Sequence, residues 1–207
     1  MKEMTGTTFD IGPISMVADF TDLNDGVWFR YESQIDLATQ GEYGGIRHSY
    51  RAGIGEVLKN LKKAQVVHFD LGIGDPVTPG PQKEQTPSLL SGNDEISWLV
   101  YPIETICEKK LHTLISHGNE NSRSKDVHDL AIFLPKVDGS TLKEALKRSF
   151  EFRSTELPKS FYTEIKKIKT DRLERGWVSA VDSIPNAMSF KTAFEKVVKL
   201  IGEIEAN

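Results

Sequence analysis

The sequence predicts an α+β protein in which a small mixed or antiparallel sheet precedes a helical bundle. The chain changes character near residue 100. Before this point, runs of β-branched and aromatic residues alternate with glycine and proline, which is typical of strands joined by turns. After it, apolar residues recur every three or four positions almost to the end, as in amphipathic helices. We therefore expect a sheet part over residues 1–100 and a helical part over residues 101–207.

Four strands are expected in the first part of the chain. The first two are joined by a turn near Gln40, and the third is followed by a break and then a loop, over residues 72–81. Strict alternation in the third strand places Asp70 on the face opposite Phe69. Residues 2–20 fit either a helix or a loop. The expected strands cover residues 27–37, 43–52, 65–71 and 96–100.

The second part is predicted to be helical throughout. Ser140 stands where its hydroxyl can cap the third helix, because Lys143 and Glu144 follow it at the start of a helical pattern. In the second helix, the buried stripe is expected to hold Val127, Leu130, Ala131 and Leu134. The expected helices cover residues 103–117, 123–134, 140–152 and 189–204, with one or two more between residues 159 and 182.

Lys110 is unusual within the first predicted helix. Ile106 and Leu114 lie four residues to either side, so Lys110 falls inside the apolar stripe. A lysine on a core-facing side must extend to solvent, pair with a carboxylate or lose its charge. The next helix carries Asp126 and Asp129 three residues apart and so on one face. We therefore expect Lys110 to pair with these aspartates across the two helices.

The rest of that first helix divides into two faces. Cys107, the chain's single cysteine, lies on the apolar face and is expected to be a core residue. A lone cysteine excludes an intramolecular disulfide and a cysteine-ligated zinc site, and it fits a reduced intracellular compartment. The polar face is expected to hold Thr105, Glu108, Lys109, His112 and Ser116.

Composition limits the possible functions. With 207 residues, 38% of them hydrophobic, the chain can bury a substantial core. A net charge of -4 argues against a surface that coats nucleic acid, but it allows a local basic patch. No apolar run approaches the roughly 20 residues of a membrane span, and the N-terminus lacks the pattern of a secretory signal. We expect a cytoplasmic protein with no membrane association.

Three blocks of sequence carry a family resemblance. The first is Glu-Tyr-Gly-Gly-Ile-Arg at residues 42–47, and the second covers residues 66–81 around Asp70. The third joins the helix of Lys110 to residues 121–130. In this order and spacing, the blocks resemble the nucleotidyltransferase toxins of the AbiEii/AbiGii family, the toxin half of type IV toxin–antitoxin and abortive-infection systems. The resemblance covers roughly residues 25–205.

The resemblance implies a polymerase-β-like core, here a truncated nucleotidyltransferase sheet followed by a C-terminal helical bundle. In such a core, carboxylates hold Mg²⁺ and a nucleotide passes from an NTP to RNA, such as tRNA, or to protein. Lys110 matches the lysine of a Glu-Lys-Leu motif, although Lys109 replaces its glutamate. The expected catalytic residues are Asp70, Lys110 and Asp126, the expected nucleotide-binding residues are Lys110, Arg123, Lys125 and Asp129, and the expected metal ligand is Asp70.

One family motif has no counterpart in the sequence. It is a Gly-Gly or Gly-Ser turn followed by an Asp-x-Asp pair, and no Asp-x-Asp occurs in the 207 residues. The alignment places Met1 after this motif, so two of three metal ligands and the phosphate-cradling turn are missing. We therefore expect a toxin-like protein with weak or no transfer activity. The alternative is a non-catalytic remnant that binds an antitoxin-type protein or RNA.

Each site residue also has a purely structural interpretation. Asp70 can be a solvent-facing carboxylate, and Lys110 can form only a structural salt bridge within an unrelated α+β scaffold. Arg123 and Lys125 can belong to a solvated helix face. The lysine clusters at residues 59–63 and 166–169 can contact RNA phosphates, although solvated helix faces are the commoner outcome.

Overall fold

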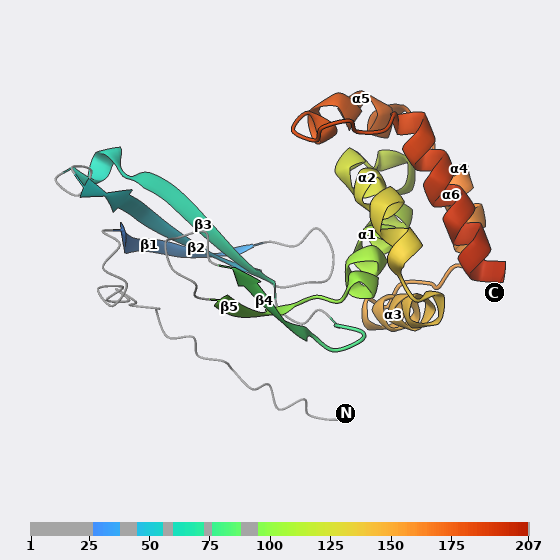
Figure 1. The fold of residues 1–207 in the computed structure, drawn as a ribbon, viewed down its shortest axis with the longest axis horizontal. Helices are drawn as coiled ribbons and strands as arrows, with labels where there is room; N and C mark the ends of the chain where they lie inside the picture. The colour runs from blue at the N-terminus through green and yellow to red at the C-terminus, as the bar shows by residue number, and fades with distance from the viewer. Residues whose placement is uncertain (1–26, 38–44, 56–59, 73–75, 88–94, 207) are drawn as a thin grey trace. The chain divides into compact units, whose positions relative to one another are not determined.

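The computed structural model describes residues 27–37, 45–55, 60–72, 76–87 and 95–206 (Figure 1). Among these residues, five antiparallel strands in two sheets precede six α-helices, which confirms the predicted α+β class. The chain forms two compact units, Met1–Asp75 (the first unit) and Pro76–Asn207 (the second unit). The expected turn near Gln40 and the ambiguous residues 2–20 lie outside the described residues.

The first unit contains a three-stranded antiparallel sheet in the order β1 (Val27–Leu37), β2 (Gly45–Ile54) and β3 (Gln65–Gly72). Aromatic side chains gather on one face. The ring of Tyr50 packs edge to face against Phe69, with 5.5 Å between centroids, and against Tyr31, at 5.7 Å. Cross-strand aromatic pairs of this kind stabilise a sheet and fix its register.

The second unit begins with a hairpin of β4 (Gln82–Pro87) and β5 (Glu95–Val100). The first of these strands was not predicted. Its residues are polar and exposed, and the last is proline, so the sequence carries no strand pattern there. Cross-strand pairing creates it: Glu84 lies opposite Trp98, whose indole N–H donates to the Thr86 hydroxyl at 3.0 Å.

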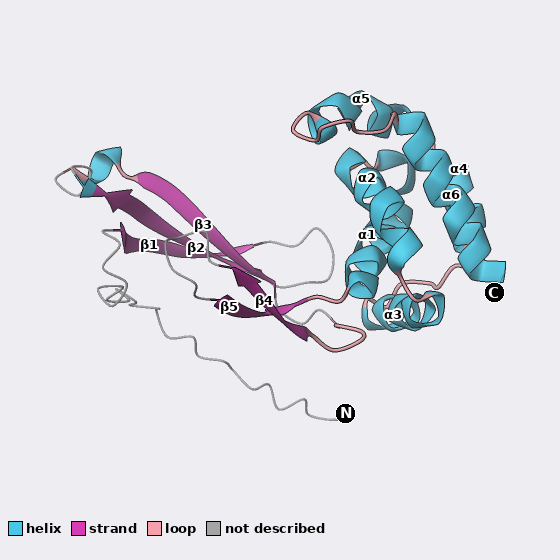
Figure 2. Ribbon diagram, in the orientation of Figure 1, coloured by secondary structure: helices cyan, strands magenta, loops and turns pink. Residues whose placement is uncertain are grey.

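The six helices follow the hairpin, and their positions confirm the sequence prediction to within two residues at nearly every end (Figure 2). Two helices lie between residues 159 and 182, as expected. The helices are α1 (Ile103–His117), α2 (Ser124–Phe133), α3 (Gly139–Phe152), α4 (Phe161–Lys167), α5 (Asp171–Val181) and α6 (Phe190–Ala206).

All six helices contribute to one core. The predicted stripe of α2 is buried throughout, and Cys107 on α1 is fully buried, as expected. Burial raises the pKa of the Cys107 thiol to about 12, so the thiolate is disfavoured. Fully buried side chains come from each helix in turn: Leu111 and Leu114, Leu130, Leu142, Ile165, Leu173, and Val197.

The predicted polar face of α1 is wrong at three positions. Thr105, Glu108 and His112 are buried, because α3 packs on α1 from that side while α2 packs on the other. The hydroxyl of Thr105 donates to the backbone oxygen of Thr78 at 2.9 Å. The ring of His112 lies 4.4 Å from that of Phe150 on α3. Because α2 and α3 cover two sides of α1, the polar residues on the side that faces α3 are buried.

The predicted cap of α3 also needs correction. The helix begins at Gly139, one residue earlier than expected, and its N-cap is Asp138 rather than Ser140. The carboxylate of Asp138 accepts from the backbone N–H of Thr141 at 2.8 Å and from the Ser140 hydroxyl at 2.6 Å. These bonds lower the pKa of Asp138 to about 2. Asp138 takes the cap position because it directly precedes the first helical residue.

Candidate functional site

Lys110 on α1 pairs with two carboxylates of α2. Its Nζ donates to Oδ1 of Asp126 at 2.7 Å and lies 2.8 Å from Oδ2 of Asp129. The Lys110 side chain is 19% exposed and that of Asp126 only 5%. This geometry confirms the pairing that the sequence predicts. Its functional role remains a prediction.

Arg123, just before α2, joins the same cluster. Its Nε donates to Oδ2 of Asp126 at 2.6 Å, while its side chain is 62% exposed. Asp126 therefore holds one cation on each oxygen. Burial of Lys110 opposes its charge, but the hydrogen bonds to Asp126 and Asp129 outweigh burial and raise the pKa of Lys110 above its usual value. Lys110 is consequently a fixed ammonium group.

Beside the Lys110 cluster, α5 packs closely against the first residue of α2. The hydroxyl of Ser124, the first residue of α2, donates to the backbone oxygen of Leu173 at 2.6 Å. A Cβ atom at Gly176 would lie 2.5 Å from that hydroxyl oxygen. A larger residue at position 176 would therefore require the Ser124 hydroxyl to move and give up its hydrogen bond, or α5 to move away from α2.

These residues line one pocket of the second unit, which we call the α2–α5 pocket. Its cavity volume is about 510 Å³, and it contains every predicted site residue of this unit: Lys110, Arg123, Lys125, Asp126 and Asp129. The sequence did not identify the other residues that line the pocket. Gly176, Ser179 and Ala180 recur on α5 at helical spacing, but that signal becomes useful only once α5 is known to pack on α2. The remaining lining residues are Ser122 and Ser124.

Asp70 lies in the first unit, on β3, where it faces Arg47 on β2. Nε and a terminal nitrogen of Arg47 each donate to a different oxygen of Asp70, both at 2.6 Å. This hydrogen bonding lowers the pKa of Asp70 below its usual range. Arg47 closes the first family block and was not singled out from the sequence. The Asp70 side chain is 47% exposed, as the alternative interpretation of a solvent-facing carboxylate expects.

The described residues do not by themselves fit a Mg²⁺ site. Mg²⁺ requires oxygen ligands, and both oxygens of Asp70 are bonded to Arg47. In the part of the chain that the structure describes, no group of three or more His, Cys, Asp or Glu side chains is placed to hold a metal ion. The metal-binding role of Asp70 stays a prediction.

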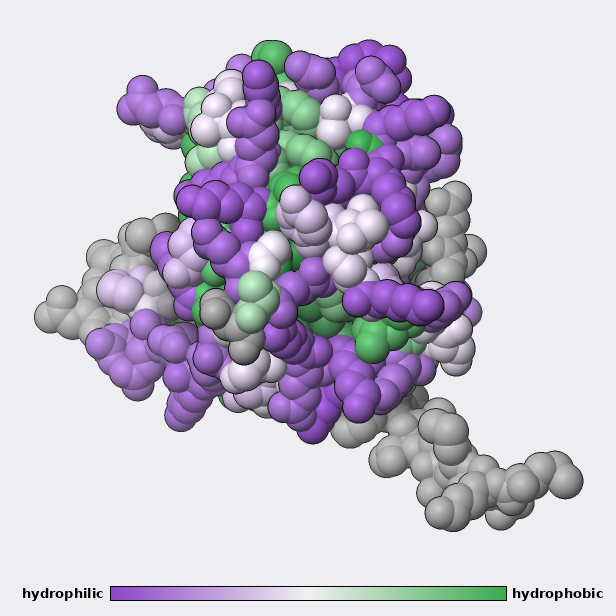
Figure 3. Space-filling view, turned by 90° about the vertical axis from the view of Figure 1, so that its right-hand side faces the viewer, coloured by the Kyte–Doolittle hydropathy of each residue, from purple (hydrophilic) through white to green (hydrophobic). Residues whose placement is uncertain are grey.

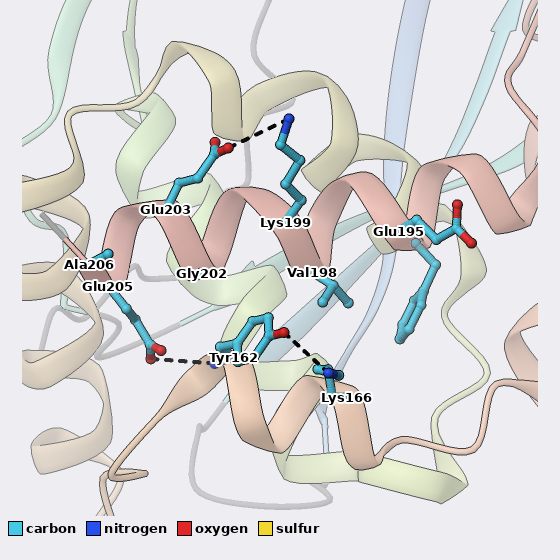
Figure 4. A pocket seen from close by; sticks show the side chains of 10 residues that line it. Tyr162, Lys166, Glu195, Val198, Lys199, Gly202, Glu203, Glu205 and Ala206 are labelled. Carbon is cyan, nitrogen blue, oxygen red and sulfur yellow. Dashed lines mark hydrogen bonds and ion pairs between the residues drawn. The ribbon is translucent and has the colours of Figure 1, made fainter.

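A larger groove lies between α4 and α6, with a cavity volume of about 960 Å³ (Figure 4). Its apolar lining includes Phe194 and Val198. On this side of the second unit, hydrophobic residues are surrounded by hydrophilic ones (Figure 3). The charged groups of the groove pair locally, as in Lys199 with Glu203 at 3.6 Å. Because it contains none of the predicted site residues, the smaller α2–α5 pocket is the better candidate for chemistry.

Comparison with known proteins agrees with the geometry. A family model described as the nucleotidyl transferase AbiEii toxin of type IV toxin–antitoxin systems matches residues 21–197. No curated protein matches the chain. Within the described residues, no helix has the length and apolar character needed to cross a membrane. The family match includes β1–β3 and the whole α2–α5 pocket, as the three sequence blocks predict. The chain therefore belongs to the AbiEii family of nucleotidyl transferase toxins of type IV toxin–antitoxin systems.

Proposed function

We propose that the α2–α5 pocket binds the phosphates of a nucleoside triphosphate. The observation that carries the proposal is the ammonium group of Lys110, which two aspartates hold at the pocket wall. Lysine has three N–H donors, so Lys110 retains one for a phosphate oxygen after bonding Asp126 and Asp129. The positioning aspartates keep the ammonium charged and fixed while it faces the pocket.

Arg123 and Lys125 complete the proposed anion site. The Nε of Arg123 bonds Asp126, which leaves the terminal nitrogens of the guanidinium for phosphate oxygens. Lys125 is exposed on the first turn of α2, beside the positive end of the helix dipole. The pocket thus brings three cations and two carboxylates together, which leaves an excess of positive charge for a polyphosphate.

We infer weak or no transfer of the nucleotide to an RNA or protein acceptor by these 207 residues. The sequence has no Asp-x-Asp pair, and Asp70 is already bonded to Arg47. Incubation with each labelled NTP, Mg²⁺ and tRNA tests this inference. Robust incorporation of label into the RNA or the protein would contradict it.

The nucleotide site is tested by Lys110→Met, with Lys109→Met as the matched control. Lys109 neighbours Lys110 but instead lies over the ring of Tyr101, 5.2 Å from its centroid. Loss of a charged hydrogen bond is worth roughly 1.5–3 kcal/mol, so Lys110→Met should weaken NTP binding about ten- to hundredfold. Equilibrium dialysis with each labelled NTP measures the affinity.

Lys110→Met could destabilise the helical bundle, so a second variant, Lys125→Met, tests the same site at an exposed residue. It should also weaken NTP binding, while Lys109→Met leaves the affinity unchanged. If Lys110→Met and Lys125→Met both bind NTP as the unaltered protein does, the proposed nucleotide site is wrong.

A second candidate function is the non-catalytic binding of an antitoxin-type protein, and the α4–α6 groove favours it. Phe194 and Val198 lie one turn apart on α6 and give the groove an apolar floor with charged edges. Such a groove fits one face of an amphipathic helix. Co-expression with the product of the neighbouring gene, followed by co-purification, tests this function. Val198→Asp should abolish the complex, whereas Lys110→Met should preserve it.

A further inference from the structure

The hairpin of β4 and β5 exposes a concentration of large apolar side chains. Of the seven large hydrophobic residues that are exposed among the described residues of the second unit, four lie within residues 96–101. They are Ile96, Trp98, Leu99 and Tyr101, and Leu99 is 74% exposed. Single apolar residues scattered over a surface need no explanation, whereas a contiguous group of this kind marks an interaction site.

The hairpin also lacks the support that so small a sheet requires. Its two strands form a sheet of their own, and all their residues are exposed except Val100, which is partly buried. A two-stranded hairpin is only marginally stable in water unless further strands or a packed face support it. We therefore expect a further strand to extend this sheet at one of its edges.

The two edges of the hairpin differ in their chemistry. β4 carries Lys83 and Glu84 and ends in Pro87, and proteins use lysine, other charges and proline to keep an edge strand from pairing. β5 has a single charged residue, Glu95, at its start. Among the strands that the structure describes, only β4 pairs with β5, so the outer edge of β5 is open. The β5 edge is therefore the one suited to a further strand.

We propose that β5 pairs antiparallel with β5 of a second copy of this chain, which joins the two hairpins into a four-stranded sheet about a two-fold axis. Such a symmetric contact uses the same surface of both copies. Directly opposite residues of an antiparallel pair point to the same face, so each register about an axis perpendicular to the sheet is centred on one residue. The register centred on Trp98 pairs the whole of residues 95–101.

Apolar side chains meet one another in this register. Trp98 lies opposite Trp98 of the second copy, and Ile96 lies opposite Val100 of the second copy. These residues alternate along β5 and so share one face of the sheet. Cross-strand pairs of aromatic and β-branched residues stabilise a sheet, which makes β5 a suitable partner for itself.

Charge complementarity favours the same register. Glu95 lies opposite Tyr101 of the second copy, and in each copy the Lys109 ammonium lies 5.2 Å from the centre of the Tyr101 ring. The carboxylate thus approaches a cation, and no like charges face each other. The register centred on Ser97 would instead place Glu95 opposite Leu99. On β4, registers centred on either of its charged residues would oppose like charges.

Sedimentation equilibrium of the full chain tests the dimer. Between about 1 µM and about 1 mM protein, the weight-average mass should rise from 23.2 kDa toward twice this value. The pairing of one strand with another buries less area than a standard interface, so we expect a dissociation constant in the micromolar range or above.

Trp98→Lys should weaken the dimer, and Gln85→Lys is its matched control. Trp98→Lys puts two lysines opposite each other at the axis and removes the indole contacts, so the dissociation constant should rise about tenfold or more. Within the hairpin, the introduced lysine faces Glu84, which favours the folded hairpin. Gln85→Lys adds the same charge to β4, away from the paired edge, and should leave the dissociation constant unchanged.

Disulfide formation under mild oxidation tests the register. In Trp98→Cys, the two introduced thiols lie directly opposite each other, close to the distance that a disulfide requires, so a covalent dimer should form. In Ile96→Cys, the thiols lie four residues apart along the strands, about 13 Å, and should not crosslink. The native Cys107 does not interfere, because it is buried and its pKa is raised to about 12.

Three results would overturn the proposal. A mass that stays at 23.2 kDa up to about 1 mM would mean that something other than a second copy covers β5. Equal weakening by Gln85→Lys and Trp98→Lys would mean that the copies associate elsewhere and respond only to added charge. A disulfide that forms as fast in Ile96→Cys as in Trp98→Cys would exclude the pairing centred on Trp98.

Discussion

Asp126 bonds Lys110 through one carboxylate oxygen at 2.7 Å and Arg123 through the other at 2.6 Å. Lys110 comes from α1 and Arg123 precedes α2, so this nearly buried carboxylate ties two elements together. Lys110 has a second partner in Asp129, and Arg123 is mostly exposed to water. Asp126 is therefore the group on which the geometry of the cluster depends most.

Asp126→Asn should destabilise the second unit more than Asp129→Asn does. The change leaves a partly buried ammonium with one carboxylate, and breaking a largely buried ion pair costs about 2–3 kcal/mol when some solvent reaches it. Urea unfolding of both variants measures the difference. Equal stability losses would contradict the assigned role of Asp126, because the Asp129 side chain is more exposed, at 18% against 5%.

Gly176→Ala should destabilise the protein by about 1–3 kcal/mol, because the added methyl group meets the Ser124 hydroxyl at 2.5 Å. Ser124→Ala alone should cost about 1 kcal/mol through its lost hydrogen bond to the Leu173 oxygen. Combined, the two changes should cost less than their sum, since the smaller side chain accommodates the methyl group. Thermal or urea unfolding of the four proteins measures this coupling. Strict additivity would show that α5 is not held against α2 in this way.

Stability should fall as the pH drops from about 6.5 to about 4, partly through His112. Burial, the nearby Arg153 charge and His117 lower the pKa of His112 to about 4 from 6.5. The unfolded chain thus binds a proton in this range while the folded one does not, so acid favours unfolding. The shift corresponds to at most about 3 kcal/mol. Urea unfolding at both pH values should show a smaller drop in His112→Asn than in the unaltered protein. His117→Gln should also reduce the drop slightly, because it removes one of the charges that lower the pKa of His112. An equal drop in His112→Asn and the unaltered protein would contradict this role of His112.

Asp70→Asn and Arg47→Met should each leave the midpoint of chemical unfolding nearly unchanged. The pair has good bidentate geometry, but both side chains are well exposed, and exposed ion pairs contribute little. Chemical unfolding followed by circular dichroism measures both variants. A clear fall of the unfolding midpoint in both variants would mean that the pair has a major structural role on the sheet.

Local spacing was enough to predict the Lys110 pairing. The periodicity of α1 and α2 fixes which face each residue occupies, and adjacent helices joined by a short segment bring those faces together. The burial of His112 could not be predicted in this way, because it depends on α3, whose packing side the sequence of α1 does not encode. Likewise, the contact between Arg47 and Asp70 could not be predicted without knowing the register in which β2 pairs with β3.

The residues that α5 contributes to the α2–α5 pocket could not be predicted from the sequence. Gly176 is significant only because Ser124 lies opposite it, and these residues are far apart in the sequence. The strand β4 was missed for a related reason, since its polar residues form a strand by pairing with β5 rather than by their own pattern. The motif residues were found through the family resemblance, and the pairing of Lys110 with Asp126 and Asp129 also followed from helical spacing.

The buried, unreactive Cys107 makes this protein convenient for spectroscopy. It is the chain's single cysteine, and its thiolate is suppressed at neutral pH. Maleimide dyes or spin labels should therefore attach only to cysteines introduced at chosen surface positions, with no need to replace the native residue. A label on the exposed side of α5, at Val178 for example, would report ligand arrival in an otherwise unaltered molecule.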